Sequence, residues 1–307
     1  MNVGRKLKTL MFLSGTLTII AEGIITYLIV SIIGIPTIFT AIFLVILWLI
    51  QWLIAPYLVG RNTEEVGPGD PLYEIVRKIA MESKVPTPRV FISYEEYPNA
   101  FAFGNYITGK RVAVTKPLLD ILNQDELEAV LAHEVGHIKH LDVEIGMALG
   151  LIPTIIGYVG NFLLFTGWTL LFFAGDEVEL ILGLAMLAIG GVLFVLTFLL
   201  QIFVLWFNRL RESFADFHSA TLYKDKAPYL ATALAKIQIY AQNIRTDPFT
   251  GIIITAPPIK LKENERDAEE LVMKWLHEHI SPFADILMTH PHPAKRVKML
   301  YSILQGT

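Results

Sequence analysis

The sequence predicts a mainly α membrane protein, in which four transmembrane helices carry a split cytoplasmic α+β domain with a small β-sheet. The first observation behind this prediction is the composition. Hydrophobic residues make up 53% of the 307 residues, charged residues only 18%, and the mean hydropathy is +0.51. Such a chain has too little polar surface to cover a soluble globule of its size. The other two observations are four long apolar stretches and the two polar segments that lie between and after them.

The apolar stretches run from about residue 10 to 34, 35 to 60, 145 to 175 and 180 to 207. Each exceeds the roughly 20 residues that a helix needs to cross the hydrocarbon core of a bilayer. One charge, Glu22, falls inside them, and it should face the bundle interior or a polar cavity because a charge in lipid is costly. We therefore divide the chain into a first transmembrane hairpin (1–60), a polar domain's first part (61–144), a second hairpin (145–207) and the domain's second part (208–307).

Basic residues set the predicted orientation. Three of them lie between positions 5 and 8, before the first span, and Arg209 and Arg211 follow the fourth. The connection between the third and fourth spans holds only acidic residues, Asp176, Glu177 and Glu179. Lysine and arginine are enriched in cytoplasmic loops, so both termini and both polar segments are expected in the cytoplasm of a multi-pass protein of the cell membrane.

The polar segments predict an α+β domain. Two short runs rich in β-branched residues, 89–93 and 111–115, enclose the segment 98–104 and predict a three-stranded sheet. Helical periodicity covers 72–83, 118–122, 125–140, 211–222, 229–241 and 263–280. The stretch 243–262, rich in Thr, Pro and Ile, is expected to form a loop or a loose hairpin over the site.

Composition also limits the partners and the metal chemistry. With no Cys there is no disulfide and no thiolate metal ligand, so any metal must bind His, Asp or Glu. A net charge of −4 provides no general attraction to nucleic acid, and we predict no nucleic-acid partner. The oligomeric state is not indicated by any pattern.

The segment His133-Glu134-Val-Gly-His137 is an H-E-x-x-H motif on the predicted helix 125–140. Positions i and i+4 lie on one face of a helix, so both imidazoles can converge on one zinc ion while Glu134 reaches a water on that ion. A hydrolytic zinc site needs a third protein ligand and an open position. Glu212 and Asp216, also at i and i+4, are candidates for that ligand and for a carboxylate that orients a ligating histidine.

Taken together, the chain resembles a membrane metallopeptidase of the HtpX type, within the gluzincin family that also contains the CAAX prenyl proteases. The resemblance covers the four spans, Asn99-Ala-Phe-Ala-Phe-Gly104, the helix ending in His137, and Arg211-Glu-Ser-Phe-Ala-Asp216. It implies a zincin-like protease domain with one Zn²⁺ per chain on His133, His137 and Glu212. It also implies that Glu134 is the general base and that Asp216 contacts a histidine ligand.

The family also places a His-Pro pair with a downstream Arg near the C-terminus. Thr289-His290-Pro291 with Arg296 is similar, and His290 would then donate to the developing oxyanion. A second pair, His292-Pro293, follows two residues on, so the choice of histidine stays open.

Substrate is expected to lie extended beside the segment Asn99, Ala100, Phe101 and Ala102. Alternating Ala and Phe suit an edge strand that pairs with a peptide backbone. The sequence thus predicts a zinc-dependent endopeptidase that hydrolyses peptide bonds of membrane proteins or peptides at the cytoplasmic membrane face.

The resemblance implies a role in stress response and in quality control of misfolded membrane proteins. One alternative is a protease of prenylated or other specific membrane-associated peptides. A catalytically silent membrane adaptor is an alternative from another class, although the motif is intact. A transporter or channel would need polar residues through several spans, and they are few.

Overall fold

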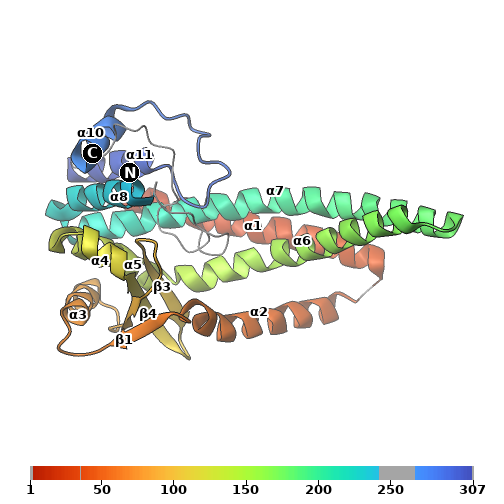
Figure 1. Ribbon diagram of the computed structural model, residues 1–307, viewed down its shortest axis with the longest axis horizontal. Coiled ribbons are helices and arrows are strands. Elements are labelled where there is room, and N and C mark those ends of the chain that lie inside the picture. The colour runs from red at the N-terminus through yellow and green to blue at the C-terminus, as the bar shows by residue number, and fades with distance from the viewer. Residues whose placement is uncertain (1–2, 35, 242–266, 306–307) are drawn as a thin grey trace. The chain divides into compact units, whose positions relative to one another are not determined.

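The computed structural model describes residues 3–34, 36–241 and 267–305. Its four longest helices are α1 (Val3–Ile33), α2 (Thr37–Val59), α6 (Asp142–Phe173) and α7 (Glu177–Leu222) (Figure 1). Each is long and apolar enough to cross a membrane, which confirms the four predicted spans. The predicted loop or hairpin at 243–262 lies outside the described residues.

Helix α7 corrects one expected boundary. The segment 211–222 was expected to be a separate helix, but it continues the fourth span without a break. No glycine or proline follows Gly191 within α7, and hydrophobic residues continue into 211–222, so nothing in the sequence ends the helix earlier. The candidate ligand Glu212 therefore lies on the same helix as the fourth span.

The chain divides into two compact units, and one of them consists of membrane helices only, residues 12–48 and 146–207. Within this unit α6 and α7 approach closely at glycines. A Cβ atom added at Gly167 would lie 2.9 Å from the carbonyl oxygen of Gly183, and one at Gly190 would lie 2.9 Å from the amide of Leu164. Small residues of this kind let helix backbones pack in lipid. Glu22 on α1 is 3% exposed, as its cost in lipid predicts.

The second unit, residues 1–11, 49–145 and 208–307, contains a four-stranded sheet. Its strands are β1 (Thr63–Val66), β2 (Arg89–Ser93), β3 (Ala100–Asn105) and β4 (Gly109–Thr115), in the order β1-β2-β4-β3. Strands β2 and β4 are parallel, and the other pairs are antiparallel. Strand β3 thus forms an edge of the sheet.

The expected three-stranded sheet was wrong by one strand. The missed strand, β1, reads Thr-Glu-Glu-Val, and both glutamates are exposed. Charged residues are rare in strands, so strand propensity does not predict a strand here. Pairing along one side of β2 holds β1 in place, and Glu65 forms an ion pair with Arg89 across that pair.

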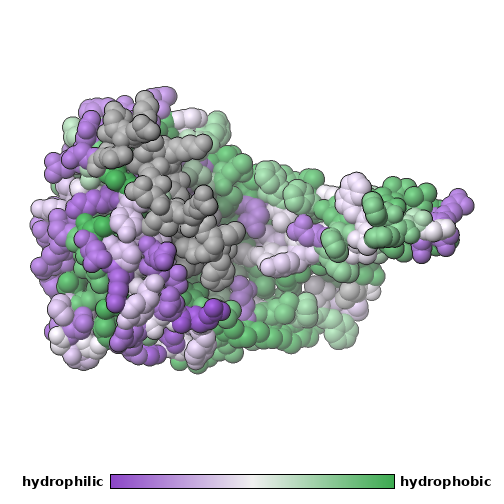
Figure 2. Space-filling view, viewed as in Figure 1, coloured by the Kyte–Doolittle hydropathy of each residue, from purple (hydrophilic) through white to green (hydrophobic). Residues whose placement is uncertain are grey.

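Six α-helices complete the described part of this unit: α3 (Pro71–Ser83), α4 (Lys116–Ile121), α5 (Gln124–His140), α8 (Ala227–Ala241), α10 (Ala268–His277) and α11 (Pro293–Leu304). The large core joins α3, α5, α8, α10 and α11 to one face of the sheet. Figure 2 shows hydrophobic side chains gathered over α1, α2, α6 and α7, and hydrophilic ones over the sheet and the shorter helices.

Helix α5 is fixed at both ends by its own sequence. Asn123 and Glu126 form a capping box at its start, in which each side chain accepts from the other residue's backbone N–H. At the other end Leu141 adopts φ 60°, a left-handed conformation that stops α5, and α6 begins at the next residue. A non-glycine residue in this region costs about 1 kcal/mol, so the turn is maintained by its surroundings.

We expect the core of this unit to depend on α3. Ile79 lies on α3 and is fully buried against the neighbouring elements of the core. The substitution Ile79→Ala should reduce the free energy of unfolding by about 2–5 kcal/mol, because burial is lost and a cavity remains. Met81, two residues on, is 65% exposed, so Met81→Ala should cost under about 0.5 kcal/mol. Chemical unfolding of the detergent-solubilised chain measures both, and equal effects would contradict the packing described.

Candidate active site

Three side chains converge in the second unit. Nε2 of His133 lies 3.1 Å from Nε2 of His137. Two different oxygens of Glu212 approach these rings, one at 3.5 Å from Nε2 of His133 and the other at 3.4 Å from Nε2 of His137. All three residues are buried, and in the part of the chain described here they form the one group of His, Asp and Glu residues that could hold a metal ion. The structure therefore brings together the three predicted ligands.

The spacing of these atoms fits a zinc ion. Zinc binds histidine nitrogen and carboxylate oxygen at about 2.0–2.2 Å in tetrahedral geometry, which places neighbouring ligand atoms about 3.3 Å apart. The 3.1 Å between the two histidine nitrogens, and the 3.5 and 3.4 Å from each of them to one of the Glu212 oxygens, bracket that value. In addition, Oε2 of Glu212 is buried without a hydrogen-bond partner among the described residues, and a bound cation would provide the missing interaction.

The charge of the site also favours a divalent cation. Four buried carboxylates surround the two histidines: Glu134, Asp142, Glu212 and Asp216. Two guanidinium groups, of Arg211 and Arg296, approach them, so the carboxylates outnumber the guanidinium groups. Burial alone would lower the pKa of His133, but contacts with Asp216 and Glu212 outweigh it and raise that pKa to about 10. The surroundings thus stabilise positive charge where the ligand atoms meet.

Asp216 occupies the place that its spacing from Glu212 predicts. One turn further along α7, its Oδ1 lies 2.8 Å from Nδ1 of His133. The other ring nitrogen of His133, Nε2, faces His137 and Glu212, and these three residues are called the metal group below. Arg296 of α11 donates from Nε and Nη2 to the two oxygens of Asp216, at 2.8 and 2.7 Å. A planar guanidinium bound this way fixes the carboxylate, and the carboxylate fixes the imidazole.

A second carboxylate, Asp142, was missed by the sequence analysis. Its Oδ2 lies 2.7 Å from Nδ1 of His137, so each histidine of the group has its own acidic partner. The two residues are five apart, which on a continuous helix would turn them to different faces. The left-handed Leu141 breaks the helix between them and returns Asp142 to His137. An acidic residue just past the motif was the available signal, but the turn was not predictable from periodicity.

Glu134 points at the edge strand instead of joining the metal group. Its Oε2 accepts a 2.9 Å hydrogen bond from the backbone N–H of Ala102, while its Oε1 is buried without a hydrogen-bond partner among the described residues. Burial raises the pKa of Glu134 above its usual range. A buried carboxylate with a raised pKa and one open oxygen is suited to accept and release a proton.

The two C-terminal histidines have different surroundings. Nε2 of His290 lies 3.8 Å from Oε1 of Glu212, and its Nδ1 lies 2.8 Å from the hydroxyl of Thr289. Burial lowers the pKa of His290 to about 4, so its ring is neutral at pH 7. His292 instead starts α11, where its Nδ1 accepts from the backbone of Ala294. Of the two candidates, His290 is the one that reaches the metal group.

The predicted substrate segment is divided by the pleat of β3. Ala100 and Ala102 face the large core beside α5, whereas Phe101 packs with Phe91 and Phe103 on the other face. Asn99 precedes the strand, and its backbone N–H donates to the hydroxyl of Thr115. Of the four predicted residues, Ala102 contacts a chemically active side chain, through the hydrogen bond to Glu134.

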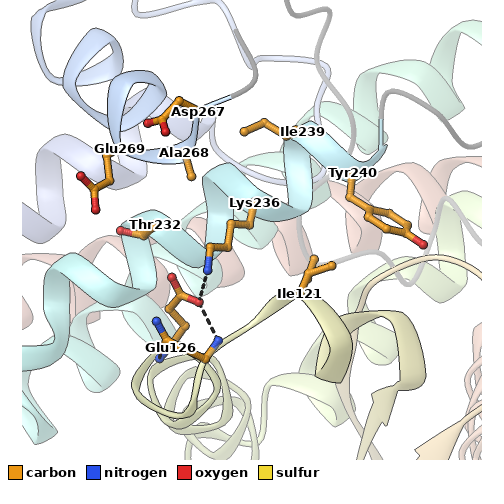
Figure 3. A pocket seen from close by; sticks show the side chains of 10 residues that line it. Ile121, Glu126, Thr232, Lys236, Ile239, Tyr240, Asp267, Ala268 and Glu269 are labelled. Carbon is orange, nitrogen blue, oxygen red and sulfur yellow. Dashed lines mark hydrogen bonds and ion pairs between the residues drawn. The ribbon is translucent and has the colours of Figure 1, made fainter.

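A pocket in the same unit lies apart from the metal group. It is bounded by the start of α5, by α8 and by the start of α10, and Figure 3 shows Lys236 and Glu126 pointing toward each other inside it, joined by a 2.7 Å ion pair. Glu126 precedes His133 by seven residues, about 10 Å along a helix. No residue of the metal group lines this pocket, so the ion pair serves to hold α8 against α5.

The chain is similar to known proteins over most of its length. The model of peptidase family M48 matches residues 70–304. The chain is 56% identical to "Protease HtpX homolog 1" of Saccharolobus solfataricus, over 100% of this chain and 99% of that protein. It is 57% identical to "Protease HtpX homolog 1" of Sulfurisphaera tokodaii, over 99% and 98%.

A solved structure shows the same fold. The crystal structure of S. mikatae Ste24p superposes with a TM-score of 0.55 at 20% identity, covering 96% of this chain and 66% of that one. The arrangement of long apolar helices and a small mixed sheet is therefore shared with Ste24p. On the family match and on identity along the full chain, this protein belongs to peptidase family M48 and is a membrane metalloprotease similar to the HtpX homologues.

Proposed function

We propose that the protein is a zinc-dependent endopeptidase that cleaves membrane proteins at the cytoplasmic face of the membrane, with one zinc ion per chain. The observation that carries the proposal is the placement of Glu134 between the metal group and the edge of β3. His133, His137 and Glu212 would hold the ion. The chemistry that zinc supplies at such a site is polarisation of a carbonyl and activation of water near neutral pH.

Strand β3 supplies the substrate position in this proposal. One side of β3 pairs with β4, and the other side has no neighbouring strand among the described residues. The N–H of Ala102 points to that open side, since it donates to Glu134. An extended peptide added along the edge would run past Glu134, with its backbone held by main-chain hydrogen bonds.

Two side chains then act on the peptide bond. Glu134 takes a proton from the attacking water at its open Oε1 and passes it to the leaving amine. His290 is neutral, and in the tautomer whose Nδ1 accepts from the Thr289 hydroxyl its Nε2 carries the proton. That Nε2–H would donate to the oxygen on which negative charge develops. Arg296 acts indirectly, by holding Asp216 against His133.

The cellular role proposed is quality control of misfolded membrane proteins. It is supported by the four apolar helices, which keep the protease domain at the membrane, and by similarity to HtpX homologues. The cytoplasmic orientation is supported by the basic residues that flank the spans and the acidic connection between α6 and α7.

Glu134→Gln tests the proposed base. The amide cannot accept the proton, so casein hydrolysis should fall by about 10²–10⁴-fold while metal content stays at one zinc per chain. Glu128→Gln is the matched control on the same helix, because Glu128 pairs with Lys226 away from the metal group and its variant should keep activity. Metal analysis and proteolysis of both purified variants decide the question. Undiminished turnover in Glu134→Gln would remove Glu134 from the mechanism.

Asp142→Ala tests the carboxylate that sequence analysis missed. Loss of a group that orients a ligating histidine should weaken zinc affinity by about 10–100-fold, measured by competition with a chelator. Asp142→Asn can still accept through its amide oxygen and should lose less. Asp120→Ala, an exposed change on α4, is the control. Wild-type zinc affinity in Asp142→Ala would show that its contact with His137 is incidental.

Single cysteines test the orientation, since the chain has none of its own. A cysteine in place of Glu177, at the exposed connection of α6 and α7, should react from outside the cell with a membrane-impermeant maleimide. One in place of Met81, exposed on α3, should react only after the cells are opened. The reverse pattern would place the protease domain outside the cytoplasm.

A further inference from the structure

The tip of the β3–β4 hairpin exposes two large side chains in a row. Tyr106 and Ile107 are each 71% exposed, and they form the hairpin loop together with Thr108. A three-residue loop of this kind needs a left-handed residue, which Gly109 supplies at φ +87°. Polar residues would satisfy the same turn, so its chemistry does not explain an exposed tyrosine and isoleucine.

The hairpin is attached to the membrane helix α2 at a proline. Pro56 lies inside α2 and has no N–H, so the carbonyl of Trp52 lacks its ordinary helical donor. Nδ2 of Asn105, the last residue of β3, donates to this carbonyl at 2.6 Å. Asn105 thus supplies a donor to a carbonyl that the proline cannot serve, and such hydrogen bonds matter most in or near lipid.

The same Asn105 side chain shapes the tip. Its Oδ1 accepts from the backbone N–H of Ile107 at 2.9 Å and of Thr108 at 2.7 Å, and Asn105 is fully buried. One amide therefore joins the turn to α2, and the tip cannot move away from α2 without breaking the hydrogen bonds on one side of this amide. Gly104 before it has φ +96°, and a Cβ there would lie 2.2 Å from the Gly109 carbonyl oxygen, which keeps the strands close.

Two cationic side chains strengthen the attachment. The guanidinium of Arg111 lies over the ring of Tyr57 at 5.5 Å and donates from Nη1 to the carbonyl of Pro56 at 3.4 Å. Lys110 forms an ion pair with Glu144 at the start of α6 and lies 5.0 Å from the ring centre of Tyr106. The base of the tip is thus tied to two of the candidate membrane helices.

The point of attachment fixes the level of the tip. The 23 residues of α2 span about 34 Å at 1.5 Å per residue, close to the roughly 30 Å of the hydrocarbon core. Trp52 lies seven residues before the end of α2 at Val59, or about 10 Å inside that end. We propose that Tyr106 and Ile107 insert into the boundary between lipid headgroups and acyl chains beside α2, so that the lipid itself covers the tip.

This placement has a consequence for substrates, which rests on the function proposed above. Ala102, which contacts Glu134, and Asn105, which contacts α2, are three residues apart on β3, about 10 Å in a strand. The edge strand therefore begins at the reacting groups and ends at the lipid boundary. A peptide segment leaving the bilayer could pair with β3 as soon as it emerged.

The insertion can be measured without any assay of proteolysis. A cysteine in place of Ile107 would carry an environment-sensitive fluorophore in phosphatidylcholine nanodiscs, with iodide in the water and nitroxide-labelled lipid as quenchers. We expect strong quenching by a nitroxide near the headgroup and at least several-fold less quenching by iodide than at a labelled cysteine in place of Met81. Met81 is the control because it is 65% exposed on α3.

Two results would overturn the proposal. Equal access of iodide to both labels would place the tip in water. Protection from both quenchers at position 107 would mean that protein covers the tip.

A second experiment tests the consequence for substrates. The double variant Tyr106→Ser with Ile107→Ser should cleave soluble casein at the wild-type rate but cleave a peptide tethered to a transmembrane anchor several-fold more slowly. An equal rate on both substrates would refute the role of the tip in substrate entry. Absence of proteolysis in the wild type would refute the proposed function but leave the fluorescence result valid.

Discussion

Burying a carboxylate without a partner is so costly that Asp216 requires a specific set of neighbours. It is fully buried on α7 and lies between the ring of His133 and the guanidinium of Arg296. Removing one member of a buried ion pair costs about 3–5 kcal/mol because the remaining charge is left uncompensated. Helices α5, α7 and α11 must therefore meet at this point for the unit to be stable. The contact between these helices also sets the positions of the metal ligands, because His133 lies on α5 and Glu212 lies on α7.

The sequence predicts the part of the site that depends on helical spacing. His133 with His137, and Glu212 with Asp216, are i,i+4 pairs whose alignment follows from the helix itself. Asp142 was not predictable in this way, because its contact with His137 depends on a left-handed residue that is neither glycine nor asparagine. The choice between His290 and His292 needed tertiary structure too, since both precede a proline and differ only in what surrounds them.

The fold shows the same division. The four spans and helix α5 follow from hydropathy and capping residues, which act within one segment. Strand β1 does not, because its two glutamates are poor strand formers and its conformation depends on pairing with β2. The edge position of β3 was expected from its alternating Ala and Phe, but the sheet order creates it, because the later strand β4 inserts between β2 and β3. Contacts between distant segments decide these features.

Asn105 shows how a distant contact can still be explained by local chemistry. The site needs a donor for the Trp52 carbonyl that Pro56 leaves without its helical partner, and it needs acceptors for two amides of the hairpin turn. An aspartate could accept but not donate, and a serine hydroxyl has one proton and too short a reach for both tasks. Asparagine combines a donor and an acceptor in one rigid group. The proline in α2 and the asparagine in the hairpin thus depend on each other, and their contact sets the position of the exposed tip.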